Sequence, residues 1–258
     1  MEDDDLFFQT TFNDILISPN DQLFENIKRP TCQHCERPVQ TCLCSHLPDT
    51  PLKLKQTTVY VLQHINEIKR PLGTVQLLTK CLDKESLNVI RSKNFSSTKY
   101  PCMKQVYNNP YTLLLFPNQN SSPLDELLKE DFYKNKHITL VAIDGTWNEA
   151  TGIFNRHNEL INLKTCYLKI DKGSEFVIRT QPTEKTMSTI ESIAHSLKYT
   201  EQNDDIYDII VRPLKRMVSM QLDMGACYHH DKLTLINNNE FKKKCGKKQY
   251  RRLLALQH

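Results

Sequence analysis

The stretch of this sequence best suited to chemistry is an acid that follows an apolar run. The β-branched run Ile138–Ile143 is followed by Asp144, Gly145, Thr146 and Trp147, and Trp147 is the single tryptophan of the chain. Such a run is typical of a buried parallel strand, which would deliver the carboxylate to a strand-to-helix turn. Because ligands of open α/β sheets bind outside the carboxyl ends of strands, Asp144 is a candidate catalytic residue. The alternative is that Asp144 only caps the next helix.

Other functional side chains stand at the ends of further expected strands. They are His64, Pro117 and Arg179, the last followed by Gln181 and Pro182. We expect a histidine, a carboxylate, an arginine and an aromatic ring to meet on one rim of the sheet. Each also has a plainer interpretation: the histidine as a surface residue, the tryptophan as core packing, the arginine as the partner of a nearby acid.

A cluster of cysteines predicts a metal site near the N-terminus. Cys32, Cys35, Cys42 and Cys44 form a C-x2-C pair followed by a C-x-C pair. Zinc prefers four soft ligands in a tetrahedron, and two tight turns that each present two thiolates provide them. His34 and His46 are reserve ligands, and the alternative is a loop of free cysteines.

Charge and composition limit the classes of protein to which this chain can belong. The chain has 258 residues and nine cysteines, and its N-terminus is acidic where a signal peptide would be basic. We therefore expect reduced cysteines, a cytoplasmic or nuclear protein, and no membrane span, because no apolar run approaches the roughly 18–20 residues required. A basic tail suggests contact with nucleic acid, although a solvated end is the alternative. Its cationic residues are Lys242, Lys243, Lys244, Lys247, Lys248, Arg251 and Arg252.

Expected strands and helices alternate along the sequence. This pattern predicts an α/β fold with a mostly parallel sheet and flanking helices, which would position these groups. The expected strands are 57–64, a short one within 84–106, 111–116, 138–143 and 165–170, with an extended segment at 175–179. The expected helices are 75–81, 123–132, one from Trp147 to about Asn155, 186–199, and one from Asp204 to about Gly225 with a kink at Pro213. The predicted domains are a flexible acidic segment 1–27, a zinc knuckle 28–50, a catalytic domain 51–235 and a basic tail 236–258.

Two common nucleotide-binding motifs are missing from the sequence. It contains neither a G-x-x-x-x-G-K loop nor a G-x-G-x-x-G turn. These absences argue against a P-loop NTPase and against a Rossmann dinucleotide or methyltransferase site.

Several blocks in the same order resemble the DTW-domain family. Asp144-Gly145-Thr146-Trp147 matches its D-x-T-W signature, and Cys32–Cys44 is similar to its cysteine cluster. Gln63–Glu67 is similar to its H-P-x-E segment, and Val177–Glu191 is similar to its I-R-x-x-P…L-S-T-x-E block. The blocks extend from about Arg29 to Gln221, which is most of the chain.

The resemblance implies a tRNA-uridine aminocarboxypropyltransferase with a SPOUT-like fold. Such an enzyme transfers the 3-amino-3-carboxypropyl group of S-adenosylmethionine to N3 of a D-loop uridine and releases methylthioadenosine. Alignment of the two substrates would supply much of the catalysis. The tRNA would be bound largely through its phosphates, by the basic tail. Two alternatives stay open: a SPOUT-like RNA methyltransferase, and a non-catalytic zinc-bearing RNA-binding module.

Site roles follow as expectations from this resemblance. Asp144 is the expected general base, with His64 as the second candidate. Arg179 would hold the methionyl carboxylate, because a guanidinium fork fits a carboxylate well. Trp147 would stack on adenine or form a wall of the pocket. The other expected cofactor-binding residues are Pro117, Gly145, Thr146, Gln181, Pro182, Ser188, Thr189 and Glu191.

Overall fold

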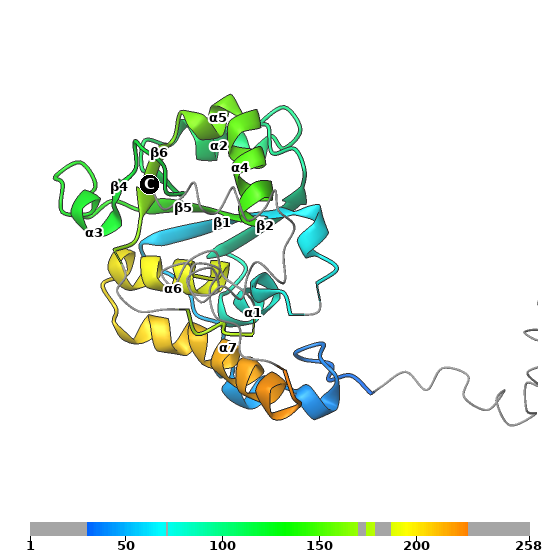
Figure 1. Cartoon of the computed structure of the whole chain (residues 1–258). Coiled ribbons are helices and arrows are strands. Elements are labelled where there is room, and N and C mark those ends of the chain that lie inside the picture. The colour runs from blue at the N-terminus through cyan, green and yellow to red at the C-terminus, as the bar shows by residue number, and fades with distance from the viewer. Residues whose placement is uncertain (1–29, 71, 170–173, 179–186, 227–258) are drawn as a thin grey trace, which may run out of the picture. The chain divides into compact units, whose positions relative to one another are not determined.

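A six-stranded sheet forms the centre of the computed structural model (Figure 1). The structure describes residues 30–70, 72–169, 174–178 and 187–226. Within them the strand order is β2-β1-β5-β3-β6-β4, and every paired neighbour is parallel. The strands are β1 (Thr57–His64), β2 (Leu87–Ser92), β3 (Thr112–Leu115), β4 (Ser122–Pro123), β5 (Ile138–Asp144) and β6 (Lys164–Tyr167). The predicted α/β class with a mostly parallel sheet is confirmed, whereas the likeness to SPOUT proteins stays a prediction.

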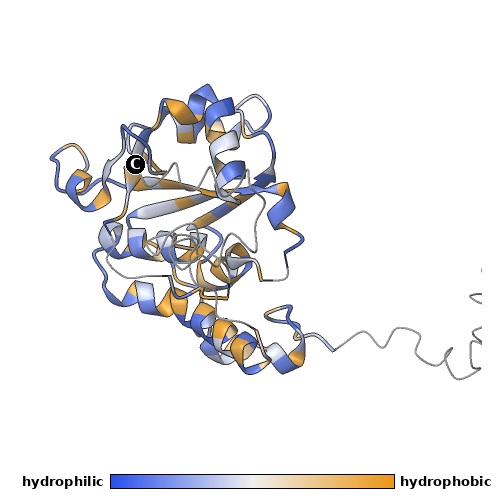
Figure 2. Ribbon diagram, viewed as in Figure 1, coloured by the Kyte–Doolittle hydropathy of each residue, from blue (hydrophilic) through white to orange (hydrophobic). Residues whose placement is uncertain are grey.

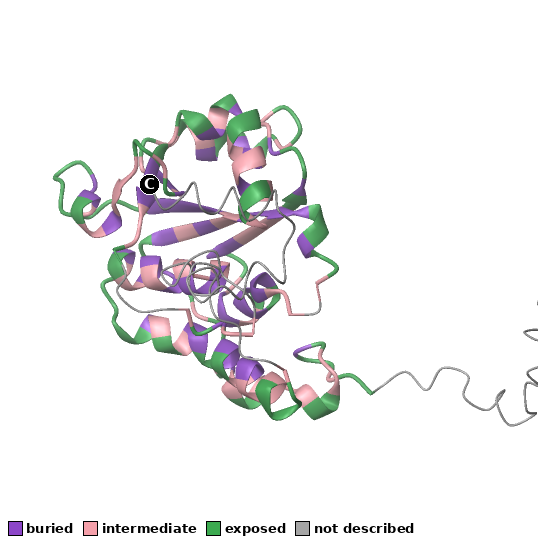
Figure 3. Ribbon diagram, in the orientation of Figure 1, coloured by how far each residue is buried: buried purple, intermediate pink, exposed green. Residues whose placement is uncertain are grey.

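The central strands are apolar because both faces of the sheet are covered. Strand β5 lies between β1 and β3, and Val59, Val61, Leu140 and Val141 are fully buried. A parallel sheet covered on both faces requires such continuous apolar runs. Figure 3 shows that these strands consist largely of buried residues. The register pairs Gln63 with Asp144, which places the ends of β1 and β5 side by side.

Helices cover the two faces of the sheet as separate layers (Figure 1). One layer contains α2 (Cys102–Asn108), α4 (Trp147–Arg156) and α5 (Asn158–Ile161), and the other contains α1 (Thr74–Cys81), α6 (Thr189–Thr200) and α7 (Asp205–Asp223). Under the first layer, Met103 and Ile153 pack with Leu62 and Val141 of the sheet. In the second layer α6 and α7 carry apolar stripes on one side and polar residues on the other (Figure 2).

Helix α6 contacts both ends of the sheet. At its C-terminus the Thr57 hydroxyl donates to Thr200 Oγ1 at 2.7 Å, and the next residue, Glu201, accepts from the backbone amides of Lys55 and Gln56. At its N-terminus α6 begins beside the end of β5. The helix is therefore held against the full length of the central strands.

Some predicted elements differ from the structure. The helix expected over 123–132 is only α3 (Leu124–Leu127), because Lys129 and Glu130 bond three residues back and the chain continues as tight turns. The segment 84–106 contains α2 as well as the expected strand. Glu175–Ile178, the described part of the segment 175–179 that was expected to be extended, forms a bend and a turn, since polar groups here and at Ser174 bond to α6 rather than to a neighbouring strand.

The chain divides into two compact units, residues 1–42 and 43–258. In the first unit an antiparallel bridge between Thr31 and Pro38 closes a tight turn, in which the Cys32 amide donates to the Arg37 carbonyl. The predicted acidic lead-in 1–27 and the whole predicted basic tail 236–258 lie outside the described residues. None of the described helices is both long and apolar enough to cross a membrane.

Candidate active site at the ends of β1 and β5

Asp144 is buried at the end of β5 and both of its carboxylate oxygens accept hydrogen bonds. Gln63 Nε2 donates to Oδ2 at 2.9 Å, and Thr189 Oγ1 donates to Oδ1 at 2.6 Å. The Gln63 amide is itself oriented by Arg91, whose Nε donates to Gln63 Oε1 at 3.0 Å. A carboxylate has about four lone-pair directions, so each oxygen keeps one for another partner. The carboxylate is therefore fixed in place and still able to accept a proton.

The helix cap beside Asp144 is Thr146, which argues against a capping role for the acid. Thr146 is the N-cap of α4, and it forms a capping box with Glu149. The Glu149 amide donates to Thr146 Oγ1 at 3.3 Å, and the Thr146 amide donates to Glu149 Oε2 at 2.8 Å. The start of α4 is thus satisfied without Asp144.

His64, at the end of β1, forms a pair with Glu149. Its Nδ1 lies 3.1 Å from Glu149 Oε1, and both side chains are largely buried. Asn66 Nδ2 also donates to Oε1, at 2.8 Å. A carboxylate on one ring nitrogen sets the tautomer and orientation of an imidazole, which leaves the other nitrogen to exchange protons. The pair has the form of an oriented acid–base group.

Gly145 is closely approached by both side chains of this pair. A Cβ atom at Gly145 would lie 3.2 Å from Glu149 Cβ and 3.5 Å from His64 Cβ. The first separation is tighter than ordinary side-chain contacts, so a larger residue would push Glu149 away from His64. The glycine of the D-x-T-W block therefore leaves room for His64 and Glu149 to stay close together.

The hydrogen bonds to Glu149 make its protonation state sensitive to folding. Burial raises the Glu149 pKa, but bonds from the Thr146 backbone and side chain, with smaller contributions from Asn66 and His64, outweigh burial and lower the pKa from 4.5 to about 2. A carboxylate with a lowered folded-state pKa stabilises the fold above its unfolded-state pKa, and this contribution is lost as the pH falls through the folded-state value.

We therefore expect Glu149→Gln to flatten the acid-induced loss of stability. Between about pH 4.5 and pH 2, wild-type protein should lose stability more steeply than the variant, because only the wild type takes up a proton at this site. Urea unfolding followed by circular dichroism over this pH range measures both slopes. Parallel curves for the two proteins would contradict the assignment.

Trp147 is an exposed aromatic platform rather than a core residue. Its side chain is 51% exposed, and it stacks on buried Phe116 with ring centroids 5.5 Å apart and an interplanar angle of 5°. Phe116 stacks in turn on Phe154 at 4.5 Å. Exposed Pro117 follows Phe116 in the chain. The outer face of Trp147 is therefore free to stack on a planar ring.

A second capping box holds the start of α6 beside Asp144. Ser188 is the N-cap, and its amide donates to Glu191 Oε2 at 2.9 Å. Glu191 is fully buried and also accepts from the Ser174 hydroxyl at 2.7 Å and from the Glu175 amide at 2.6 Å. Protein donors thus occupy the Glu191 carboxylate, which favours a role in positioning Thr189 and the 174–175 turn.

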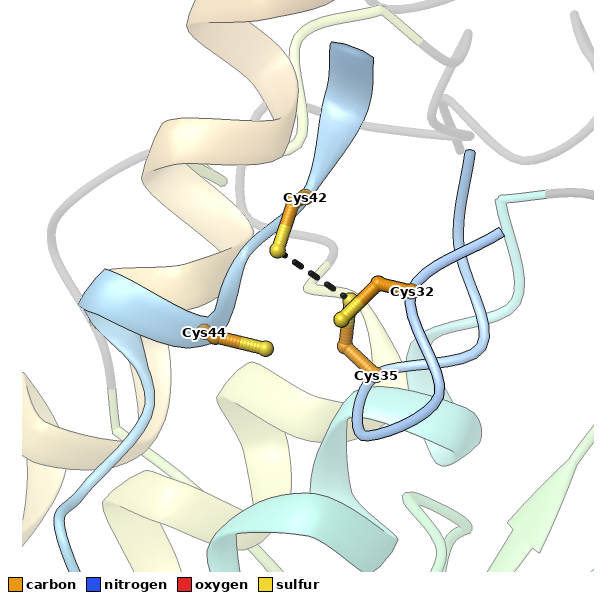
Figure 4. A group of neighbouring side chains, drawn as sticks. All are labelled: Cys32, Cys35, Cys42 and Cys44. Atoms are coloured by element: carbon orange, nitrogen blue, oxygen red, sulfur yellow. Dashed lines mark hydrogen bonds between the residues drawn. The ribbon is translucent and has the colours of Figure 1, made fainter. Parts of the chain in front are cut away.

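The four clustered cysteines come together as predicted. Their Sγ atoms all lie within 4.8 Å of one another, and those of Cys35 and Cys42 are 3.7 Å apart (Figure 4). Tetrahedral zinc with Zn–S bonds of about 2.3 Å separates its sulfurs by about 3.8 Å. The sulfurs are therefore spaced to hold such an ion, and neither reserve histidine belongs to the group.

Comparison with known proteins identifies the family. The DTW domain model matches residues 29–222, about three quarters of the chain. The chain belongs to the DTW domain family. Asp144–Trp147 is the motif for which the DTW family is named, and in the structure it begins at the last residue of β5.

Named DTW relatives cover most of the chain. Proteins called tRNA-uridine aminocarboxypropyltransferase 2 from Macaca fascicularis and Drosophila melanogaster are each 36% identical, over 84% and 88% of this chain and 72% and 88% of their own lengths. A protein called tRNA-uridine aminocarboxypropyltransferase A from Arabidopsis thaliana is 26% identical over 81% of this chain and 87% of its own length. No solved structure matches the chain significantly.

The structure brings most of the predicted DTW site residues to one edge of the sheet. Arg179, Gln181 and Pro182 lie outside the described residues, as do all seven cationic residues of the tail. Sequence reasoning missed two members, Gln63 and Glu149. The spacing of the Thr146-x-x-Glu149 capping box could have revealed the second. Nothing in the sequence indicated that Gln63 would bond to Asp144, because this contact depends on the register between β1 and β5.

Proposed function

We propose that this protein is a tRNA-uridine aminocarboxypropyltransferase that uses S-adenosylmethionine. The observation that carries the proposal is the 36–37% identity to relatives of that name over 84–88% of the chain. The transferred 3-amino-3-carboxypropyl group would go to N3 of a D-loop uridine, with release of methylthioadenosine. The site at the ends of β1 and β5 supports this reaction, because it combines an oriented carboxylate, an oriented imidazole and an exposed aromatic ring.

The proposed reaction requires orientation and one proton transfer. Uridine N3 forms a bond to the γ-carbon of the methionyl chain, the carbon–sulfur bond breaks, and its electron pair neutralises the sulfonium. The N3 proton must go to a base on the protein. Asp144 is the proposed acceptor, because Gln63 and Thr189 fix its carboxylate and leave lone pairs open. His64, oriented by Glu149, is the second candidate.

The remaining proposed contacts concern the methionyl donor and the target base. Arg179 would pair with the donor carboxylate, and the start of α6 at Ser188 and Thr189 would lie near its amino group or ribose. The exposed face of Trp147 fits either adenine or the uracil ring, since stacking needs only a planar partner. Gly145 and Thr146 form the turn between these groups, and Pro117 flanks the Phe116–Trp147 stack.

A product assay tests the proposed function. Purified protein is incubated with S-adenosylmethionine and unmodified tRNA, and small molecules and nucleosides are analysed by mass spectrometry. Methylthioadenosine together with an aminocarboxypropyl-uridine supports the proposal. S-adenosylhomocysteine with a methylated nucleoside would instead identify a methyltransferase. Absence of both products would contradict catalysis and leave the RNA-binding module as the better interpretation.

We also propose that Cys32, Cys35, Cys42 and Cys44 hold a structural zinc ion. The sulfur spacing and the soft donor set both fit zinc, and four protein ligands would leave no open position for a substrate. The ion would stabilise the turns between Cys32 and Cys44 and would take no part in the reaction. The cytoplasmic or nuclear location expected from the sequence agrees with reduced thiolates and stays a prediction.

We expect a single zinc ion per chain that is lost when one ligand is removed. Cys42→Ser should abolish stoichiometric metal, because serine is a poor zinc ligand. Cys102→Ser is the matched control, since Cys102 is exposed at the start of α2 and outside the cluster. Metal analysis of both variants gives the result, and a chelator should lower the melting temperature of the wild type. Unchanged melting after complete chelation would contradict a structural ion.

A further inference from the structure

Helix α7 presents cationic side chains along one exposed face. Arg212, Lys215, Arg216 and Ser219 are three or four residues apart, which places them on one side of the helix. This face forms one wall of a cavity of about 430 Å³, here called the α7 groove. The residues that line it are His46, Asp208, Arg212, Lys215, Arg216 and Ser219.

Arg212 of α7 is bonded to the opposite wall of the groove. Arg212 Nε donates to the His46 carbonyl at 3.0 Å, and Nη2 donates to the Leu47 carbonyl at 3.3 Å. These bonds tie α7 to η3 (Cys44–His46), the 3-10 turn that carries His46. The two walls of the groove, both in the second unit, are therefore held together by direct hydrogen bonds.

The charge in the groove is only partly neutralised. Lys215 Nζ lies 3.6 Å from both Glu175 Oε1 and Asp208 Oδ1, which are long, exposed ion pairs of little strength. Within the part of the chain that the structure describes, no carboxylate forms an ion pair with Arg216. Three cationic residues thus face a single acid in the lining. Guanidinium and ammonium groups beside a serine hydroxyl are the donors that bind phosphate.

The α7 groove lies in the helical layer that also contains α6, which begins beside Asp144. A chain of contacts joins the two places. Lys215 approaches Glu175, and the Glu175 amide donates to Glu191, which caps α6.

We propose that the α7 groove binds backbone phosphates of the tRNA substrate. This inference rests on the proposed function and adds a binding surface distinct from both the reacting groups and the basic tail. A polynucleotide fits better than a small phosphate ester, because the lining offers several cations spread along a helix face rather than around one enclosed point.

Arg216→Gln tests the proposal with the full chain. Binding of fluorescently labelled tRNA is measured by anisotropy over a series of salt concentrations. Loss of one phosphate contact should weaken binding about three- to tenfold at low salt and lower the slope of log Kd against log salt by about 0.7–1. Arg216→Lys, which keeps the charge, should retain most of the slope.

Lys104→Gln is the matched control for a lost positive charge. Lys104 is exposed on α2, in the layer on the opposite face of the sheet. The Lys104→Gln variant should bind tRNA with the same affinity and salt slope as the wild type. Equal slopes for Arg216→Gln and Lys104→Gln would overturn the groove proposal. Unchanged melting temperatures would confirm that both variants are folded. Among folded variants, the slope of log Kd against log salt should depend on the charge at position 216.

Release of methylthioadenosine by the wild type separates this proposal from the proposed function. If product forms and Arg216→Gln binds tRNA normally, the groove proposal fails and the function stands. If the wild type shows a groove-dependent salt slope without forming product, the function fails and the groove stands. Wild-type protein that does not bind tRNA at all would overturn both.

Discussion

Asp144→Asn should lower the rate of aminocarboxypropyl transfer by about two to four orders of magnitude while the protein stays folded. A positioned general base typically contributes a factor of that size. The amide can keep both local bonds, since its oxygen accepts from Gln63 and its nitrogen can donate to the Thr189 hydroxyl. We therefore expect the free energy of unfolding to fall by only about 1 kcal/mol. Single-turnover assays at saturating tRNA and S-adenosylmethionine measure the rate.

His64→Gln and Asp131→Asn complete this experiment. Asp131 is an exposed acid in a turn before β5, so its amide variant removes the same charge and should keep the wild-type rate. If Asp144→Asn turns over normally while His64→Gln does not, His64 is the base and Glu149 orients it. Full activity in both variants would rule out either residue as the base.

Glu191→Ala should destabilise the protein by about 3–5 kcal/mol, because each buried donor left without an acceptor costs about 1–3 kcal/mol and some of them can find new partners. Four donors would lose their acceptor: the Ser188 amide and hydroxyl, the Ser174 hydroxyl and the Glu175 amide. Glu191 is fully buried, so water would not replace it easily. Denaturant unfolding followed by circular dichroism measures the loss, which should come with a lower affinity for S-adenosylmethionine because the start of α6 is released.

Glu149→Ala is the natural comparison, because Glu149 occupies the same position of the other capping box. Its side chain is partly exposed, unlike that of Glu191, so water can reach the groups that it leaves. We expect a loss of about 1–2 kcal/mol, close to the usual effect of a helix cap. Equal losses in the free energy of unfolding for the two variants would show that burial does not determine how much each capping box stabilises the protein.

The apolar pattern predicted the central strands well, because parallel strands covered on both faces must be apolar throughout. The runs at Thr57–His64 and Ile138–Asp144 became β1 and β5 with little change in their bounds. The periodicity of α6 was equally clear. Leu124–Leu127 was harder, since its acids suit both a helix and a series of tight turns and only tertiary packing decides where the helix ends.

The candidate site was predictable in its members and less so in their partners. Asp144 and His64 stand out because polar residues end apolar runs. The donors to Asp144 come from residues 81 and 45 positions away, and such pairings depend on strand register and on the path of α6. The α7 groove is similar: the cationic spacing on α7 is visible in the sequence, but its other wall lies 166 residues away.

The position of α6 determines when the site can form during synthesis of the chain. Asp144 obtains one partner from β1 and the other from Thr189, and the last residue of α6 bonds to the first residue of β1. The carboxylate thus cannot reach its final arrangement until about residue 200 has left the ribosome. Until then α1 is the only helix of that layer that has been made, and such non-local parallel sheets fold slowly. Apolar residues on that face of the sheet therefore stay exposed, and prone to aggregation, until α6 and α7 have been made.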